Sequence, residues 1–317
     1  MEQEVGHLPV MLEEVILALS PHPGSFQIDA TVGGGGHAVR ILEAVNPDGR
    51  LLGIDADPRA IERSSARLSG YGQRVILRQA NFESMAEVAG ESGFEAVDGI
   101  LMDLGVSSQQ LDHDDRGFSF RSSDELDMRF DTTVGIPASE VVATYSEARL
   151  ADVFKRHGEE RHARRIARAI VAARAEAPIA TPARLAEVVT KATPRPTSHR
   201  RRRIHPATRV FQALRIEVNR ELETLPAALE SAVELLRPDG RLCVISYHSL
   251  EDRIVKRFLA RERRGCTCPP ELPVCVCGKQ PRVAGIGAQP QLPSDTEVAS
   301  NPRARSAKLR AARRLPA

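Results

Sequence analysis

The chain has 317 residues, of which 42% are hydrophobic and 27% are charged, and its formal net charge is +2. These values are typical of a globular protein with room for a large core and a second domain. No stretch approaches the ~20 apolar residues of a membrane span, and the acidic start Met1-Glu-Gln-Glu4 does not resemble a signal peptide. We therefore expect a cytoplasmic protein without a membrane segment, and nothing in the sequence indicates an obligate protein partner.

The small net charge hides a strong separation of charge along the chain. Residues 155–220 contain 17 lysines and arginines but 5 acids, whereas residues 81–131 contain 13 acids and 3 arginines. A dense basic segment favours a nucleic-acid partner, because guanidinium groups release counterions from a phosphate backbone. The predicted phosphate contacts are Arg200, Arg201, Arg202 and Arg203. That run alone is equally compatible with a solvated helix face or a loop.

The first elements predicted along the chain surround a glycine-rich turn. Residues 7–17 form an amphipathic pattern typical of a helix, with Pro9 in its first turn. The apolar residues 25–28 then predict a buried strand, and residues 37–45 predict a helix. Four glycines, Gly33 to Gly36, connect the two. Glycine accepts positive φ and has no Cβ, so a ligand can approach the helix N-terminus closely.

A carboxylate follows the glycine turn at a meaningful distance. Residues 50–55 predict a second buried strand, and this strand ends in Asp55, about 20 residues after the glycines. Nucleotide-binding folds place there the acid that binds ribose hydroxyls, so we expect a nucleoside-containing cofactor. The pattern Gly33-x-Gly35-x-x-Ala38 also fits a dinucleotide site, which leaves a nicotinamide-dependent dehydrogenase as a rival. A plain glycine loop is the simplest alternative.

Strands and helices continue to alternate up to residue 103. The predicted order is a helix at 58–68, a strand at 74–80, a helix at 83–91 and a strand at 96–103. This alternation predicts a parallel sheet with helices on both faces, whose ligand lies beyond the carboxyl ends of the strands. Four residues should converge at that edge: Gly36, Asp55, Phe82 and Asp103.

The alternation stops between residues 105 and 206, where only helices are predicted, at 138–154, 163–175 and 182–192. The sheet resumes with a helical stretch at 208–236, interrupted at Pro226, and a strand at 240–248 that brings Tyr247 and His248 to the same edge. We therefore predict an α/β domain formed by residues 1–104 and 207–317, with an inserted helical domain at 105–206. The basic end, residues 301–314, is either a last strand or a tail.

Four of the five cysteines form a cluster in a proline- and glycine-containing arm. They are Cys266, Cys268, Cys275 and Cys277, whereas Cys243 lies alone in a predicted strand and is expected in the core. In a cytosolic protein such a cluster indicates metal before disulfide. However, the C-x-C spacing is tighter than the usual C-x₂₋₄-C of zinc sites. Unliganded thiols are therefore favoured over zinc, and redox pairing is the third alternative.

The stretch Asp103-Leu-Gly-Val-Ser-Ser-Gln-Gln-Leu-Asp112 resembles the signature of the bacterial 16S ribosomal RNA cytosine-N4 methyltransferases, the MraW/RsmH family. The resemblance covers nearly the whole chain in six further blocks, at residues 7–15, 29–37, 116–120, 204–219, 245–253 and 301–308. It implies a Rossmann-like S-adenosylmethionine-dependent methyltransferase sheet with an inserted helical domain. The charge of the insert and its position after the fourth strand make it our candidate RNA-recognition domain. The resemblance also implies methylation of a cytosine in the decoding region, with 16S rRNA or the small ribosomal subunit as partner.

The resemblance assigns seven residues to the cofactor S-adenosylmethionine. They are Gly35, Gly36 and His37 at the glycine turn, Asp55 at the ribose, Phe82 against the adenine, and Asp103 and Gln110 near the methionine part. Residue types alone would favour a helix-capping role for a histidine at position 37 and a core role for Phe82. Gln110 follows from the resemblance only.

The exocyclic amine of cytosine is a poor nucleophile, so an acceptor must draw its lone pair out of conjugation. Many amino-methyltransferases use Asp/Asn-Pro-Pro-aromatic at the end of the fourth strand, but here the chain reads Asp103-Leu-Gly-Val106. We expect Asp103 or nearby backbone acceptors to orient the amine, with Tyr247 and His248 as further catalytic candidates or simple strand-end residues. Candidates for stacking on the base are Phe118, Phe120 and Tyr247. A non-catalytic RNA-binding or ribosome-assembly protein is the alternative function.

Overall fold

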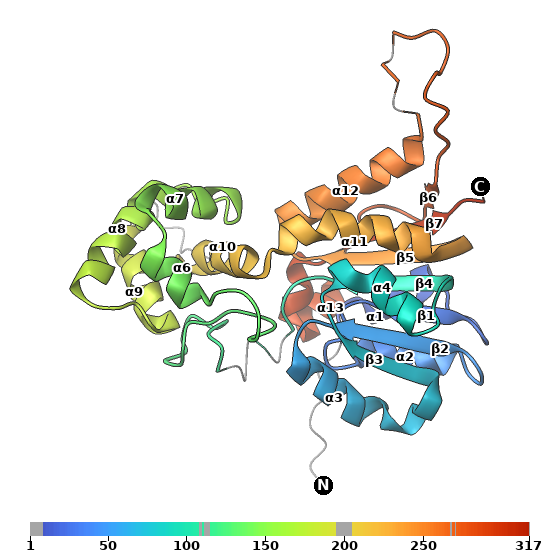
Figure 1. Cartoon of the computed structure of the whole chain (residues 1–317), viewed down its shortest axis with the longest axis horizontal. Helices are drawn as coiled ribbons and strands as arrows, with labels where there is room; N and C mark the ends of the chain where they lie inside the picture. Colours follow the sequence, from blue (N-terminus) through green and yellow to red (C-terminus); the bar gives the residue numbers. More distant parts are fainter. Residues whose placement is uncertain are drawn as a thin grey trace. The chain divides into compact units, whose positions relative to one another are not determined.

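The computed structural model describes residues 9–107, 110, 115–194, 205–266, 268–269 and 271–316. The chain divides into two compact units. The first unit is formed by Met1–Gly105 and Leu222–Ala317, and the second by Val106–Glu221 (Figure 1). Arg200 to Arg203, the predicted phosphate contacts, lie outside the described residues.

A seven-stranded sheet in the order β3-β2-β1-β4-β5-β7-β6 forms the centre of the first unit. Strands β1 to β5 run parallel, whereas β7 is antiparallel to both β5 and β6, so the basic C-terminal segment is a strand. The strands are β1 (Phe26–Asp29), β2 (Arg50–Asp55), β3 (Val75–Gln79), β4 (Val97–Asp103), β5 (Leu236–Ser246), β6 (Val283–Gly285) and β7 (Lys308–Arg314). The predicted α/β fold, a Rossmann-like sheet, is confirmed.

The strand order reverses between β1 and β4. In the parallel register Ile28 pairs with Ile100 on β4, while on its other side it pairs with Leu52 on β2. The chain therefore leaves β1 toward one edge of the sheet and later returns to fill the other side. Ligands of open α/β sheets bind outside the carboxyl ends of the strands at such a reversal. Asp29 and Asp103 end the two strands that flank it.

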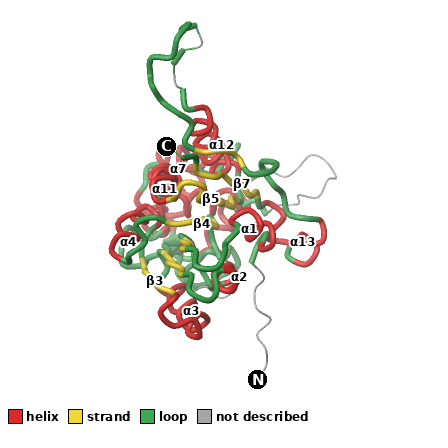
Figure 2. The backbone as a smooth tube through the Cα atoms, turned by 90° about the vertical axis from the view of Figure 1, so that its right-hand side faces the viewer, coloured by secondary structure: helices red, strands yellow, loops and turns green. Residues whose placement is uncertain are grey.

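Helices cover both faces of this sheet, because its central strands carry apolar side chains on both sides (Figure 1, Figure 2). Leu19, Ile41 and Leu68 bring three helices onto one face: α1 (Leu12–Leu19), α2 (Gly36–Ala44) and α3 (Pro58–Leu68). The other face packs against α4 (Met85–Glu91), α11 (Glu221–Leu235) and α12 (Ser249–Arg264). Short elements complete the unit, namely α13 (Asp295–Ser300) and the 3₁₀ turns Ser69–Arg74, Phe82–Ser84 and Pro302–Ser306. Among the described helices, none combines the length and the apolar character that a membrane crossing requires.

The helical stretch 208–236 breaks at Arg220, and not at Pro226 as predicted. Arg220 adopts a left-handed conformation, φ 53° and ψ 30°, and ends α10 (Thr208–Asn219). Pro226 lies inside α11, near its start. A proline there forfeits only one backbone hydrogen bond of the helix, so it is tolerated.

The described part of the second unit is built from helices and loops. Its helices are α6 (Ala138–Thr144), α7 (Glu147–Arg156), α8 (Ala163–Glu176), α9 (Pro182–Ala192) and α10. The single helix predicted at 138–154 is two helices, because Ser146 is extended and its hydroxyl accepts the Arg149 N–H as the N-cap of α7. The unit ends at Glu221, beyond the expected residue 206. The reason is that α10 buries Phe211 and Leu214 in the core of this unit.

Candidate functional site

Asp55 holds the glycine turn in place. One carboxylate oxygen of Asp55 accepts the Gly33 N–H at 2.9 Å, and the other accepts the Asp57 N–H at 2.9 Å. Gly33 and Gly35 have φ of 52° and 76°, which side chains with a Cβ rarely adopt. A Cβ on Gly36 would lie 2.5 Å from Pro9 Cγ. The turn thus depends on glycine both for its conformation and for close packing against the N-terminal segment.

Three carboxylates end neighbouring parallel strands: Asp29 on β1, Asp55 on β2 and Asp103 on β4. Burial raises the pKa of Asp29 to about 8, of Asp103 to about 7 and of Asp55 to about 6. Repulsion from Asp103 and Asp55 adds to the shift of Asp29. A group of desolvated carboxylates favours a cationic ligand. Asp29 was missed in the sequence, although it also ends a buried strand with an acid, as Asp55 and Asp103 do.

Asp103 is linked to two residues from other elements. Its Oδ1 accepts a 2.8 Å hydrogen bond from the phenol of Tyr247, and its backbone N–H donates to Thr31 Oγ1 at 2.6 Å. Burial raises the pKa of Asp103, the hydrogen bond from Tyr247 lowers it, and the charge of Glu251 raises it. Burial and the neighbouring Asp103 hold the pKa of Tyr247 well above its usual value, so the phenol is a donor.

His37 connects the N-terminal segment to this carboxylate. It lies in the first turn of α2 and is only 6% exposed. The ring Nε2 lies 3.1 Å from the carbonyl oxygen of Val10, and Nδ1 lies 3.8 Å from Asp103 Oδ2. A carbonyl accepts only, so Nε2 carries a proton, and Nδ1 is the ring nitrogen that faces Asp103. His37 is therefore buried between the N-terminal segment and Asp103, and it is not a surface residue.

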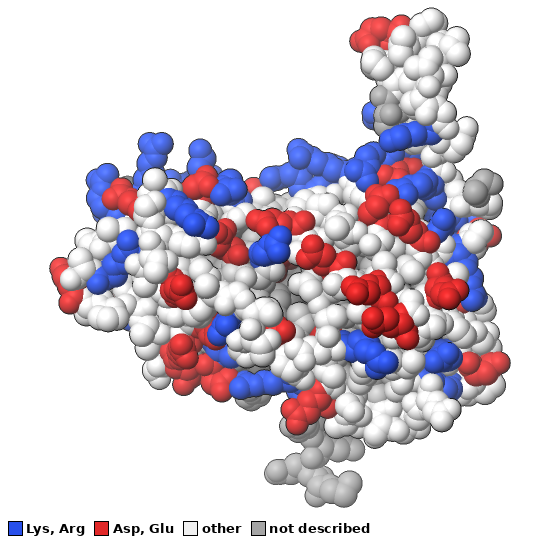
Figure 3. All heavy atoms as spheres, viewed as in Figure 1, with Lys and Arg blue, Asp and Glu red and all other residues white. Residues whose placement is uncertain are grey.

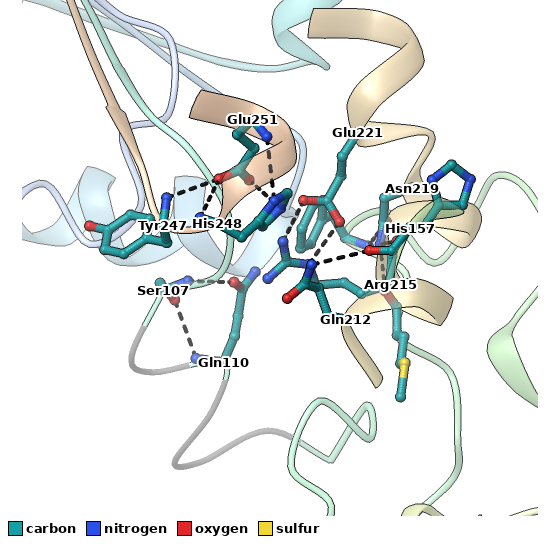
Figure 4. Close-up of polar contacts among 12 residues, drawn as sticks. Ser107, Gln110, His157, Gln212, Arg215, Asn219, Glu221, Tyr247, His248 and Glu251 are labelled. Carbon is teal, nitrogen blue, oxygen red and sulfur yellow. Dashed lines mark hydrogen bonds and ion pairs between the residues drawn. The ribbon is translucent and has the colours of Figure 1, made fainter. Parts of the chain in front are cut away.

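His248 caps α12 (Figure 4). Its Nδ1 accepts the Glu251 N–H, and the Glu251 carboxylate accepts the backbone N–H groups of Tyr247 at 2.9 Å and His248 at 3.3 Å. This reciprocal capping box satisfies backbone donors at the start of the helix. His248 therefore positions the start of α12, and the buried Glu251 holds the backbone of Tyr247 in place. The spacing His-x-x-Glu was the sequence signal for this role.

Phe82 begins a 3₁₀ turn after β3 and packs, partly buried, against the core of the first unit. Six of the seven predicted cofactor residues therefore lie at the carboxyl ends of the strands of this unit. Gln110 belongs to the second unit, where its Oε1 accepts the Ser107 N–H at 2.9 Å and its own N–H donates to Ser107 Oγ at 3.2 Å (Figure 4). These contacts resemble a capping box.

Two of the three stacking candidates belong to the second unit, where Phe118 is a core residue and Phe120 packs, partly buried, against that core. Phe118 is 6% exposed and stacks on Phe130, with ring centroids 5.8 Å apart. Phe120 stacks on His205 at 4.6 Å and meets Phe211 edge-on. Tyr247 is the candidate that lies at the strand ends of the first unit.

Exposed basic side chains cover parts of each unit. In the second unit they lie on α7, on α8 and between them: Lys155, Arg156, Arg161, Arg164, Arg165 and Arg168. In the first unit they follow α12, over which blue atoms gather in Figure 3: Arg253, Lys256, Arg257, Arg263 and Arg264. We call this second set the α12 basic surface. It was missed because acids are interspersed with these residues in the sequence, and the helix sorts the two kinds onto different faces.

The residues at the strand ends fit S-adenosylmethionine. Buried carboxylates complement its sulfonium and ammonium charges, and the glycine turn allows close approach to the backbone. Asp55 ends β2, the position at which nucleotide-binding folds place the acid for ribose hydroxyls. A Rossmann-like sheet with such a site at the strand-order reversal defines the class of S-adenosylmethionine-dependent methyltransferases.

The chain belongs to the MraW methylase family, whose model matches residues 4–315. It is 53% identical over 309 residues to Ribosomal RNA small subunit methyltransferase H of Syntrophotalea carbinolica, covering 98% of both chains. The protein of the same name from Thermomicrobium roseum is 53% identical over 98% of this chain and 94% of that one. The one from Geobacter sulfurreducens is 53% identical over 98% and 99%. The predicted family, enzyme class and cofactor are confirmed, and the dehydrogenase and non-catalytic alternatives are excluded.

Proposed function

We propose that the protein is a cytoplasmic enzyme that methylates N4 of a cytidine in the decoding region of 16S rRNA. The relatives are named for small-subunit ribosomal RNA, and the sequence resembles cytosine-N4 enzymes. The structural observation that carries the proposal is the hydrogen-bonded pair of Asp103 and Tyr247 at the end of β4. A carboxylate there can accept a hydrogen bond and then a proton from an exocyclic amine, and the family resemblance supports N4 of a cytosine as that amine.

The N4 amine must lose one proton when it gains a methyl group. Asp103 accepts a hydrogen bond from the amine, which weakens delocalisation of the lone pair into the ring, and then accepts the proton. A pKa of about 7 suits this exchange near neutral pH. Tyr247 fixes the orientation of the carboxylate through its 2.8 Å hydrogen bond. S-adenosylmethionine supplies a methyl group activated by its sulfonium charge.

The proposed cofactor contacts keep the roles that the resemblance assigns. Asp55 binds the ribose hydroxyls with lone pairs not used by the Gly33 and Asp57 N–H groups. Phe82 packs against the adenine. Gly35, Gly36 and His37 contact the cofactor at the glycine turn. The contact of Gln110 rests on the resemblance alone.

A cytosine is reached by an enzyme only when it is single-stranded or flipped out of a helix. We propose that the second unit, Val106–Glu221, is an RNA-recognition domain, with Arg200 to Arg203 contacting phosphates. The α12 basic surface is proposed as a further phosphate contact, since α12 begins directly after Tyr247 and His248. Such contacts position the RNA without reading its sequence.

Methyl transfer tests the proposed function directly. Purified protein, labelled S-adenosylmethionine and small ribosomal subunits that lack the modification should give labelled N4-methylcytidine on nucleoside analysis. Free 16S rRNA as a parallel substrate tells which form the enzyme requires. Label on a ring carbon or a ribose oxygen would contradict the proposed role of Asp103, and no transfer to either substrate by folded, cofactor-binding protein would contradict the proposed substrate.

A further inference from the structure

The four-cysteine cluster lies in an arm formed by residues 265–282, which we call the Cys arm. The arm connects the end of α12 to β6 and extends beyond both of them in Figure 1. Because α12 has 16 residues, the arm begins about 24 Å from the strand-end carboxylates near which that helix starts. The cluster is therefore separate from the cofactor site.

The four sulfur atoms are spaced as in a mononuclear metal site. Cys275 Sγ lies 3.5 Å from Cys266 Sγ, 3.9 Å from Cys268 Sγ and 3.5 Å from Cys277 Sγ. Cys266 and Cys277 are 3.8 Å apart, and all four sulfur atoms lie within 4.8 Å of one another. A tetrahedral zinc ion with Zn–S bonds of about 2.3 Å places its sulfur ligands about 3.8 Å apart.

Other uses of four thiols fit this spacing less well. A disulfide requires two sulfur atoms at about 2.05 Å, but here the neighbouring sulfur atoms lie 3.5–3.9 Å apart, and Cys266, Cys275 and Cys277 each have more than one such neighbour. An iron–sulfur cluster contains several metal and sulfide atoms between its cysteines, so it separates the ligand sulfurs more widely. The C-x-C spacing is tighter than in most zinc sites, but the fold of the arm still brings all four sulfur atoms together. Six residues separate the two Cys pairs in sequence, and the chain folds back over them.

The Cys arm has little hydrophobic core of its own. Leu272, Val274 and Val276 are 45%, 70% and 77% exposed, so apolar burial cannot hold the arm together. Small segments of this kind usually need a disulfide or a metal. The backbone adds a contact typical of thiolate ligands, because the Val276 N–H donates to Cys268 Sγ at 3.4 Å. The base of the arm is anchored separately, where the Arg282 N–H donates to the Glu262 carbonyl at 2.9 Å.

We propose that Cys266, Cys268, Cys275 and Cys277 together bind one structural zinc ion that holds the Cys arm in its fold. Four thiols lose their protons as Zn²⁺ binds, giving a tetrathiolate site with a net charge of about −2. The adjacent basic residues Arg263, Arg264 and Lys279 compensate this charge along the chain. With four protein ligands the site is closed, so its role is structural and not catalytic.

The metal content of the full-length protein tests this proposal. Protein purified with a reductant and without chelators should contain one zinc ion per chain. Cys268→Ser and Cys275→Ser variants should lose most of the zinc, whereas Cys243→Ala, which removes the buried thiol of β5, should retain it. Cobalt(II) added to the metal-free protein should give the intense visible bands of a tetrahedral thiolate site. Circular dichroism of each variant distinguishes a missing ligand from a failure to fold.

Limited proteolysis gives a second readout that does not depend on variants. Trypsin should cleave after Arg264 and Lys279 at least about tenfold faster once zinc is removed, while sites outside the Cys arm in the first unit are cleaved no faster. Equal cleavage with and without zinc would overturn the structural role. Wild-type protein that stays metal-free even after incubation with zinc, stoichiometric iron in its place, or a mass four hydrogens lower from two disulfides would each overturn the zinc assignment.

Discussion

The phenol of Tyr247 donates a 2.8 Å hydrogen bond to Asp103 Oδ1, although 144 residues separate the two in sequence. The whole second unit is inserted between them. The contact forms because β4 and β5 are parallel neighbours, so Asp103 and the residues after Ser246 reach the same edge of the sheet. Through this contact Tyr247 sets the orientation of Asp103, the proposed acceptor of the amine proton, and lowers the pKa of Asp103.

Replacement of Asp103 with asparagine should reduce the turnover number about 100-fold or more, because the amide keeps the shape but cannot accept a proton. Methyl transfer under saturating cofactor and RNA measures this decrease. The matched control is Glu95→Gln, which neutralises an exposed acid just before β4 and should leave turnover unchanged. Normal turnover of the Asp103→Asn enzyme would remove this residue from the mechanism.

Replacement of Tyr247 with phenylalanine should move the acidic limb of the pH–rate profile to higher pH. The hydrogen bond from Tyr247 lowers the pKa of Asp103, so its removal raises the pH at which the carboxylate form becomes available. The measurement is kcat/KM for methyl transfer between pH 5 and 9. A profile that keeps its position while the overall rate falls would show that Tyr247 acts only by packing.

Gly36→Ala should destabilise the protein and weaken cofactor binding, because the new Cβ would lie 2.5 Å from Pro9 Cγ and displace the N-terminal segment. We expect a decrease of about 1–3 kcal/mol in the free energy of unfolding. Gly90→Ala is the matched control, since nothing lies within 4 Å of its Cβ and it sits inside α4. This control should be neutral or gain up to about 1 kcal/mol. Urea unfolding and calorimetric titration with S-adenosylmethionine distinguish the two variants.

The ligand-free protein should lose stability as pH rises from about 5 to 8. Asp29, Asp103 and Asp55 have pKa values of about 8, 7 and 6 in the folded protein, above the ordinary 3.8. In this range the folded chain holds protons that the unfolded chain has released, so higher pH favours unfolding. Each such carboxyl contributes on the order of 1 kcal/mol per pH unit. Asp29→Asn should flatten the decline in chemical denaturation, and an unchanged slope would contradict the buried ionisation of Asp29.

Neutralising the α12 basic surface should weaken RNA binding and reduce its salt dependence. The variant Lys256→Gln/Arg257→Gln removes two exposed cations. The slope of the logarithm of RNA affinity against the logarithm of salt concentration should become smaller by about 0.7–0.9 for each phosphate that the variant no longer neutralises. Arg59→Gln, on the exposed side of α3, is the control. A parallel variant with Arg200 to Arg203 replaced by glutamine tests the other predicted patch. An unchanged salt slope would remove the tested patch from the RNA interface.

The sequence alone determined the parallel sheet, the glycine turn and the acids at the strand ends. Buried strands of a parallel sheet are continuous apolar runs, and an acid such as Asp55 directly after one stands out. The same local pattern predicted Asp103, while six ordered blocks identified the family. Helix boundaries were less certain where capping decided them. Ser146 splits one predicted helix into two. Another predicted helix ends at Arg220, whereas its predicted break at Pro226 does not occur.

Only the tertiary structure decided which of these residues meet. The contact of Tyr247 with Asp103 depends on strand neighbours far apart in sequence, and the role of His248 depends on its cap on α12. Burial of Asp29 depends on packing from both faces of the sheet, which local sequence does not reveal. The four cysteines show the same limit, because their spacing suggested free thiols and only the fold of the arm brings their sulfur atoms within 4.8 Å of one another.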